Sequence, residues 1–167
     1  NTYKLDTIKR NIVFFTSSTD EWAAISDEIT PDFLFQSQYM AVEWLANYFG
    51  DKVDVVFYLR LHPHLMKKNP KEQQLWQRLA ESQPHMELLT PDDAVDTYTL
   101  MENADLVITY GSTTGVEAVY WGTPSITLAR CLYHELDIAY FPKSMEELFA
   151  LLDNTELKLL ICNYAQK

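Results

Sequence analysis

Short apolar runs alternate with segments of helical periodicity along most of this chain. The runs that predict buried strands lie at 11–16, 53–61, 86–89, 106–110 and 125–128. They are rich in β-branched and aromatic residues and nearly continuous, as strands buried on both faces of a sheet require. Between them, apolar residues recur every three or four positions, which predicts helices at 35–49, 71–82, 91–101, 113–121 and from 144 onward. A further helical repeat covers about 155–165.

Local signals support several of these boundaries. Gly50 ends the helix before the second strand. Ser144, followed three residues later by Glu147, has the spacing of a capping box. Pro91 and the two aspartates after it predict that a helix begins directly after the third strand. The segment 17–31 is polar, and we expect a loop with a short helix there.

The alternation of strands and helices predicts a Rossmann-like, doubly wound α/β domain, with a mostly parallel sheet and helices on both faces. A length of 167 residues suits one domain over 1–167, with its core at about 10–153 and a C-terminal helix at about 155–165. Ligands of such sheets bind at the carboxyl ends of the strands. Three polar clusters follow the carboxyl ends of predicted strands. They are Thr16 with Ser17 and Ser18, the segment 60–63, and the segment 111–114. We expect them to converge on one edge of the sheet.

The composition narrows the classes of partner. The chain carries 24 acidic against 13 basic residues, a formal charge of −11. A surface of that sign repels nucleic acids and anionic membranes, so neither is an expected partner. It also repels a phosphorylated ligand, which would therefore need a local and directional site. No apolar run approaches the ~18 residues of a membrane span, so no transmembrane segment is expected.

Metal and cofactor chemistry has no recognisable motif in the chain. Cys131 and Cys162 form neither a CxxC pair nor a zinc spacing, and they favour a reducing compartment. No Ser-His-Asp arrangement and no DxD motif stand out, since Asp92 and Asp93 alone are not one. We expect no metal and no cofactor. The chain begins with Asn1 in place of Met, as a piece of a longer protein would.

The segment 111–115, Gly-Ser-Thr-Thr-Gly, follows a strand and precedes a helix. Gly111 permits a sharp turn, and Ser112 or Thr113 can serve as the N-cap. The next N–H groups, Thr114 included, would then face outward at the positive end of the helix, where a phosphate binds well. The alternative is an ordinary cap after a tight turn. The segment is neither a Walker A loop nor GxGxxG, so neither an ATPase nor a dehydrogenase is indicated.

Charged side chains near these strand ends are the other candidates. Glu117 either complements the helix dipole or accepts hydrogen bonds from two hydroxyls, as a ribose offers. Arg60 and His62 share one face of a strand, so both can donate to phosphate as catalytic groups. Alternatively, Arg60 pairs with an acid and His62 bonds the backbone. The next histidine, His64, faces the other way, which favours a surface role.

Two further residues are weaker candidates for substrate binding. Ser17 lies in a hydroxyl-rich loop that is either solvated or in contact with the transferred group. Arg130, followed by Tyr133 and His134 after the fifth strand, is a candidate second phosphate ligand.

Together these motifs resemble a known family. The segments 60–63 (Arg-Leu-His-Pro), 104–118 and 122–124 (Gly-Thr-Pro) resemble the C-terminal, donor-binding half of GT-B glycosyltransferases. They look most like bacterial capsule polysaccharide biosynthesis proteins, a group that includes Kdo transferases. The resemblance spans about 10–153. It implies a site for a CMP-, CDP- or UDP-linked sugar and transfer of that sugar to a surface or capsular glycan. It also implies that His62 contacts the donor phosphate, that 112–114 cradle it and that Glu117 binds the ribose.

One departure from the family matters. A whole GT-B enzyme has two Rossmann-like halves, and this chain has room for one, so we expect the N-terminal acceptor domain to lie elsewhere. We expect a cytoplasmic protein, with a peripheral position at the inner membrane face open for the full-length protein. Two rivals remain, namely a sugar-nucleotide epimerase of the UDP-GlcNAc 2-epimerase type and a non-catalytic module that binds sugar nucleotides.

Overall fold

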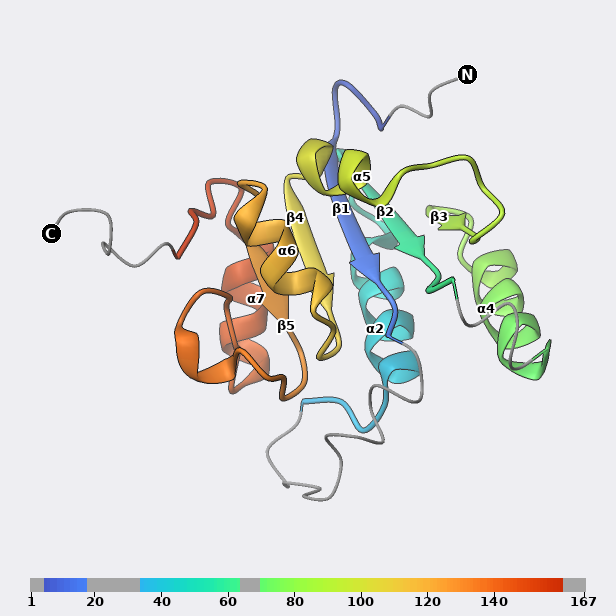
Figure 1. Ribbon diagram of the computed structural model, residues 1–167. Helices are drawn as coiled ribbons and strands as arrows, with labels where there is room; N and C mark the ends of the chain where they lie inside the picture. The colour runs from blue at the N-terminus through green and yellow to red at the C-terminus, as the bar shows by residue number, and fades with distance from the viewer. Residues whose placement is uncertain (1–4, 18–33, 64–69, 161–167) are drawn as a thin grey trace, which may run out of the picture.

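The computed structural model describes residues 5–17, 34–63 and 70–160 (Figure 1). Over these residues the chain forms a five-stranded sheet in the order β3-β2-β1-β4-β5, and every neighbouring pair is parallel. The strands are β1 (Arg10–Phe15), β2 (Val55–Arg60), β3 (Met86–Leu89), β4 (Leu106–Thr109) and β5 (Ser125–Thr127). The predicted Rossmann-like α/β class is therefore confirmed.

The central strand brings distant parts of the sequence together at one edge. The last residue of β1, Phe15, pairs with Arg60 of β2 on one side and with Thr109 of β4 on the other. The chain passes from β1 outward to β2 and β3, then returns to place β4 on the opposite side of β1. Such a reversal leaves a crevice at the carboxyl ends of the two flanking strands, which is where open α/β sheets bind their ligands.

Helices cover both faces of the sheet, as the alternation along the sequence predicts (Figure 1). Among the described residues they are α2 (Gln38–Gly50), α4 (Pro70–Ser82), α5 (Thr97–Asn103), α6 (Thr114–Tyr120) and α7 (Met145–Asp153), and a 3₁₀ turn covers His134–Leu136. The helices α2, α4 and α7 pack on one face with Ile12 and Phe14, whereas α5 and α6 pack on the other with Val13 and Phe15. Successive β1 residues thus serve opposite cores, since strand side chains alternate.

The helix expected to begin at Pro91 begins at Thr97 instead. The carboxylate of Asp93 accepts hydrogen bonds from the amide and hydroxyl of Thr90, at 2.5 and 2.8 Å, which closes a turn after β3. Asp96 then caps the helix by accepting from the Thr99 amide at 2.8 Å. Aspartate side chains compete with helix formation in this way, so they favour turns and caps over helix interiors.

The C-terminal helix expected over about 155–165 is wrong in its described part, since 154–160 contains no helix. Helix α7 ends at Asp153, and Tyr140 donates a hydrogen bond to the Lys158 carbonyl at 2.8 Å, which holds the segment in a non-helical path. Leu157 packs against the core from this path. Residues 161–165 lie outside the described residues, as do Ser18, His64 and the short helix expected within 17–31, of which only Ser17 is described.

Across 5–17, 34–63 and 70–160, no helix is long and apolar enough to cross a membrane. The same residues contain no group of three or more His, Cys, Asp or Glu side chains placed to hold a metal ion.

Candidate functional site

Hydrogen bonds from the end of β1 tie together the loops that follow β2 and β4. The His62 amide donates to the Thr16 hydroxyl at 2.8 Å, and the Ser17 hydroxyl donates to the Tyr110 carbonyl at 3.2 Å. Because β2 and β4 both flank β1, the two loops start about 10 Å apart, twice the usual strand spacing. The described residues of the three polar clusters therefore meet at one edge of the sheet, as expected.

The turn after β4 lies close to the loop after β5 because two glycines leave room. Gly111 has a φ of +83°, a conformation that other residues rarely adopt. A Cβ at this position would also lie 2.9 Å from the Arg130 carbonyl oxygen. At Gly115, on the first turn of α6, a Cβ would lie 2.2 Å from the Tyr133 hydroxyl oxygen. The turn is thus pressed against β5 and the segment that follows it.

The Tyr133 side chain holds this turn in place through hydrogen bonds of its hydroxyl group. Its hydroxyl donates to the Ser112 carbonyl at 2.6 Å and lies 3.2 Å from the Thr127 hydroxyl, which is in turn 3.1 Å from the Thr109 hydroxyl. Burial raises the pKa of Tyr133, so the hydroxyl keeps its proton and remains a donor. The sequence showed Tyr133 only as one of three polar or aromatic residues after the fifth strand. The missed signal is Gly115, whose absent side chain leaves space for this hydroxyl.

The backbone amides of the turn are only partly available to a ligand. Those of Gly115 and Val116 already bond the carbonyls of Ser112 and Thr113, at 3.2 and 3.0 Å, and the Thr114 amide lies 3.3 Å from the Ser112 hydroxyl. The Ser112 and Thr113 amides donate no hydrogen bond to another described residue. An anion at this turn would therefore bind these two amides.

The side chains of the turn bond one another. Thr113 occupies the N-cap position, as one of the two expected residues, but its side chain makes no capping bond. Its hydroxyl instead donates to Glu117 at 3.4 Å, and the hydroxyls of Ser112 and Thr114 lie 2.9 Å apart. Thr113 is exposed and Glu117 is half-buried. Both side chains can therefore be reached from the edge of the sheet.

The hydrogen bonds of Arg60 indicate a structural role, whereas the sequence predicted a catalytic role for this residue. Its side chain is 7% exposed, and its guanidinium donates to the Thr90 carbonyl and, at 3.1 Å, to the Val95 carbonyl. Burial lowers the pKa of the guanidinium, and the nearby Asp93 and Asp96 act in the opposite direction. Arg60 thus points toward the loop between β3 and α5 and holds two of its carbonyls. The partners are backbone oxygens, and among the described residues Arg60 forms no ion pair with an acid, which was the alternative considered from the sequence.

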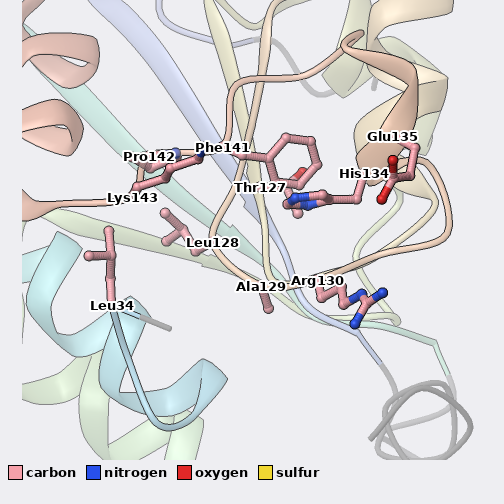
Figure 2. A pocket seen from close by; sticks show the side chains of 10 residues that line it. All are labelled: Leu34, Thr127, Leu128, Ala129, Arg130, His134, Glu135, Phe141, Pro142 and Lys143. Carbon is pink, nitrogen blue, oxygen red and sulfur yellow. The ribbon is translucent and has the colours of Figure 1, made fainter. Parts of the chain in front are cut away.

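The remaining candidates occupy different positions around the edge. Ser17 is buried, and its amide donates to the Gln38 side chain at 2.6 Å. Its amide and its hydroxyl are therefore both bonded within the protein. His62 is half-buried at the end of β2. Arg130 is exposed at the end of β5 and lines a cavity beside Ala129 (Figure 2). Of the predicted site residues, His62, Glu117 and the turn therefore remain as candidates at this edge, with Arg130 beside them.

Solved structures share this arrangement of strands and helices. A protein from Listeria monocytogenes described as a UDP-N-acetylglucosamine 2-epimerase matches 90% of the chain with a TM-score of 0.61 and 19% identity. The structure of S. aureus MnaA with UDP matches 91% with a TM-score of 0.59 and 16% identity. The C-terminal CMP-Kdo binding domain of WaaA from Acinetobacter baumannii matches 90% with a TM-score of 0.50 and 10% identity. The fold is that of one half of a GT-B enzyme.

The matches also show what share of each matched protein's length the chain covers. It spans 38% and 41% of the first two proteins, but 85% of the WaaA domain structure. At these identities the likeness concerns the fold alone. No family model and no curated protein matches the sequence.

Proposed function

We propose that this chain is the donor-binding half of a glycosyltransferase, which moves a sugar from a nucleotide-activated donor to a surface or capsular polysaccharide. The observation that carries the proposal is the pair of amides at Ser112 and Thr113, which have no acceptor among the described residues. They lie at the edge where the end of β1 ties the His62 loop to the turn after β4. Such amides at the end of a parallel strand are suited to a phosphate.

Each group at this edge has a role in the proposal. The two amides and the exposed Thr113 hydroxyl would hold the phosphate of the donor. His62 would donate to the same phosphate and stabilise the charge that develops on it as the sugar leaves. Glu117 would accept hydrogen bonds from the ribose hydroxyls, with its bond from Thr113 fixing its orientation. Arg60 and Ser17 would act by holding the loops in place, since their hydrogen bonds go to the protein.

The ligands named for structures with this fold are a second support for the proposal. Solved structures that share it include one determined with UDP and one described as a CMP-Kdo binding domain. Both ligands are nucleotides with a phosphate group on the 5′ side, and the motifs do not favour one base over the other. The proposal therefore covers CMP-, CDP- and UDP-linked donors. It places the enzyme in the cytoplasm, where the free cysteine Cys131 stays reduced.

A sugar-nucleotide epimerase of the UDP-GlcNAc 2-epimerase type is the second candidate. The observation that favours it is the fold match, with a TM-score of 0.61, to the Listeria monocytogenes protein described as such an epimerase. The two candidates differ in their need for an acceptor. Incubation of the full-length protein with UDP-GlcNAc alone separates them, because an epimerase converts the sugar without a glycan and a transferase does not.

Nucleotide binding by variants of the chain tests the proposed site. We expect His62→Ala and Glu117→Ala each to weaken binding of the preferred nucleotide about tenfold, or ~1.4 kcal/mol, because each removes one charged or imidazole partner. The measurement is calorimetric titration with CMP, CDP and UDP, which also ranks the bases.

Matched controls come from elsewhere on the surface. His85, before β3, and Glu102, in α5, are both exposed and lie outside the edge, so His85→Ala and Glu102→Ala should bind as the unaltered chain does. All four variants should unfold cooperatively at similar denaturant concentrations. Unchanged affinity in both His62→Ala and Glu117→Ala would defeat the assignment of the site.

A further inference from the structure

Exposed aromatic side chains gather where α5 and α6 meet, on the face of the sheet opposite α2, α4 and α7 (Figure 1). Tyr98 of α5 is 48% exposed, and Tyr120 and Trp121, at the end of α6, are 83% and 44% exposed. The ring centroids of Tyr98 and Trp121 lie 5.6 Å apart, and those of Tyr120 and Trp121 lie 5.7 Å apart. Each ring contacts another, so the three form one aromatic surface, which we call the α5–α6 patch.

The packing of the two helices holds this patch in place. Leu100 and Met101 of α5 are buried in the same core cluster as Ala118 of α6. The Thr123 hydroxyl, just after α6, donates to the Met101 carbonyl at 2.6 Å. Along α6, with a rise of about 1.5 Å per residue, the patch lies about 10 Å from the turn that precedes the helix. The patch is therefore a preformed surface, separate from the groups of the candidate phosphate site.

The chain around the patch carries charge of one sign only. Between 86 and 129, a range that includes α5, β4 and α6, the sequence has seven acidic residues and no lysine, arginine or histidine. They are Glu87, Asp92, Asp93, Asp96, Glu102, Asp105 and Glu117, all exposed except the half-buried Glu117. Glu102 lies one helical turn from Tyr98, on the same side of α5. Arg60 of β2 lies near Asp93 and Asp96, but its side chain is buried.

These two features together select the chemistry of a partner. A cation is attracted to the face of an aromatic ring and to a carboxylate, and a guanidinium also stacks on the ring through its flat surface. Aromatic residues and arginine are the types enriched at the centres of protein interfaces. Other occupants meet like charge, because nucleic acids and anionic membranes are negative and a second copy of this chain has a formal charge of −11.

We propose that the α5–α6 patch docks an arginine-containing segment of a partner protein. The inference goes beyond the proposed function, because it uses another surface and needs no nucleotide. Arginine side chains of the partner would stack on Trp121 and Tyr98 and pair with Glu102. Apolar side chains of the same segment would cover the Tyr120 ring.

Synthetic peptides that differ in one residue type test the inference. The probe is an amphipathic helical peptide in which arginines flank a stripe of leucines, and two matched peptides carry lysine or glutamate in place of arginine. The measurement is the change in backbone NMR signals of the chain on titration, which also locates the binding. We expect the arginine peptide to shift the signals of 97–103 and 117–122. It should bind about fivefold more tightly than the lysine peptide, and the glutamate peptide should not bind.

Variants of the chain identify the groups involved. Trp121→Ala and Tyr120→Ala should each weaken binding of the arginine peptide about threefold to fivefold, and Glu102→Gln about twofold. Tyr120 is exposed enough that its removal should leave the unfolding midpoint unchanged, so a loss of binding in this variant is not a loss of structure.

Matched controls lie elsewhere on the surface. Leu132, after β5, is 82% exposed, and Glu81, in α4, is exposed on the other face of the sheet. Leu132→Ala and Glu81→Gln should bind the arginine peptide as the unaltered chain does. These controls remove one apolar group and one negative charge, so they show what such losses do away from the patch.

Several results would overturn the inference. They are shifts spread over the whole chain, equal affinity for the arginine and lysine peptides, and unchanged affinity in Tyr120→Ala and Trp121→Ala. Tighter binding of maltohexaose at 97–103 and 117–122 would overturn it as well, since this neutral oligosaccharide can stack on aromatic rings without using the carboxylates. Titration of Tyr120→Ala with CMP, CDP and UDP is a separate readout and should match the unaltered chain. Failure of nucleotide binding therefore leaves the docking surface standing, and failure of peptide binding leaves the proposed function standing.

Discussion

The shape of the candidate site depends on the space left by Gly115. The Tyr133 hydroxyl occupies that space, where it holds the Ser112 carbonyl at 2.6 Å and meets the hydroxyl of Thr127. The turn that carries the Ser112 and Thr113 amides is thereby fixed relative to β5. Any larger residue at 115 has to displace the hydroxyl, and the turn with it.

Gly115→Ala is therefore expected to destabilise the protein. The added methyl group would lie 2.2 Å from the Tyr133 hydroxyl oxygen and 3.1 Å from the hydroxyls of Ser125 and Thr109. Overpacking of this kind costs ~1–3 kcal/mol, and equilibrium denaturation measures it. Tyr133→Phe removes the atom that clashes most, so Gly115→Ala should cost less in the Tyr133→Phe background than in the unaltered chain.

Gly50 is the matched control for this double-mutant cycle. A Cβ there would meet only a His85 ring carbon, at 3.9 Å, so Gly50→Ala should change the free energy of unfolding little. If Gly115→Ala costs the same with and without the Tyr133 hydroxyl, the two residues do not interact in the way the structure indicates.

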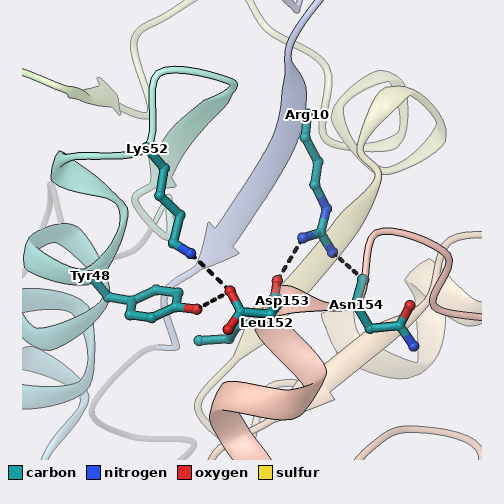
Figure 3. A network of polar contacts seen from close by, with 6 residues as sticks. All are labelled: Arg10, Tyr48, Lys52, Leu152, Asp153 and Asn154. Atoms are coloured by element: carbon teal, nitrogen blue, oxygen red, sulfur yellow. Dashed lines mark hydrogen bonds and ion pairs between the residues drawn. The ribbon is translucent and has the colours of Figure 1, made fainter.

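At the scale of elements, helix α7 is attached by its last turn to β1 and α2 (Figure 3). Arg10 of β1 donates to the carbonyls of Leu152 and Asn154, at 2.6 and 2.9 Å. Asp153 accepts from Lys52 and Tyr48, at 2.8 and 2.5 Å. Cations at a helix C-terminus satisfy carbonyls that have no partner within the helix. These contacts join residues more than a hundred positions apart.

The Asp153 contacts predict a pH dependence of stability. The hydrogen bond from Lys52, followed by that from Tyr48, lowers the pKa of Asp153 below its ordinary value of 3.8. A carboxyl with a lowered pKa stabilises the folded state above its unfolded pKa, and this contribution is lost as the pH falls through the folded value. We expect the unaltered chain to exceed Asp153→Asn in stability at pH 6 by at most ~1 kcal/mol, since the pair is exposed, and the difference to vanish at about pH 2.

Denaturation midpoints measured at several pH values for both proteins check this. The comparison with Asp153→Asn is needed because backbone hydrogen bonds from Lys9 and Ile8 lower the pKa of Asp6 as well, so the unaltered chain loses stability in acid from more than one group. A difference between the two proteins that stays constant from pH 6 to pH 2 would contradict the role given to Asp153.

At the scale of the whole molecule, the candidate site lies on an open edge of the sheet. The chain spans 38% and 41% of two proteins that share its fold. Group transfer needs the acceptor to be positioned and water to be excluded, and effective positioning alone can contribute several kcal/mol. Under the proposed function, a domain with its ligand edge exposed supplies neither by itself.

We therefore expect the isolated chain to bind a nucleotide and to transfer no sugar. The full-length protein should release nucleotide from the donor when an acceptor glycan is present, and the isolated chain should not. Nucleotide release measured with both proteins at equal concentration checks this. A chain that transfers sugar as fast as the full-length protein would mean that this domain holds a complete catalytic site.

The sequence determined the local elements and their layering. The strand β3 begins and ends where its apolar run does, at Met86 and Leu89, and Ser144 caps α7 by accepting from the Glu147 amide, as the motif predicts. Buried strands and capped helices depend on residues close in sequence, so their patterns are readable without a structure. The parallel sheet and the meeting of the clusters after β1, β2 and β4 follow from the same alternation.

The tertiary structure alone decided what several of these residues do. Arg60 bonds the carbonyls of Thr90 and Val95, thirty and thirty-five positions away, and the space at Gly115 belongs to Tyr133, which follows a different strand. The cavity beside Arg130 likewise combines three separate loops. A side chain's hydrogen-bond partners are chosen by proximity in space, and proximity between distant segments is set only when the sheet and its helices have packed.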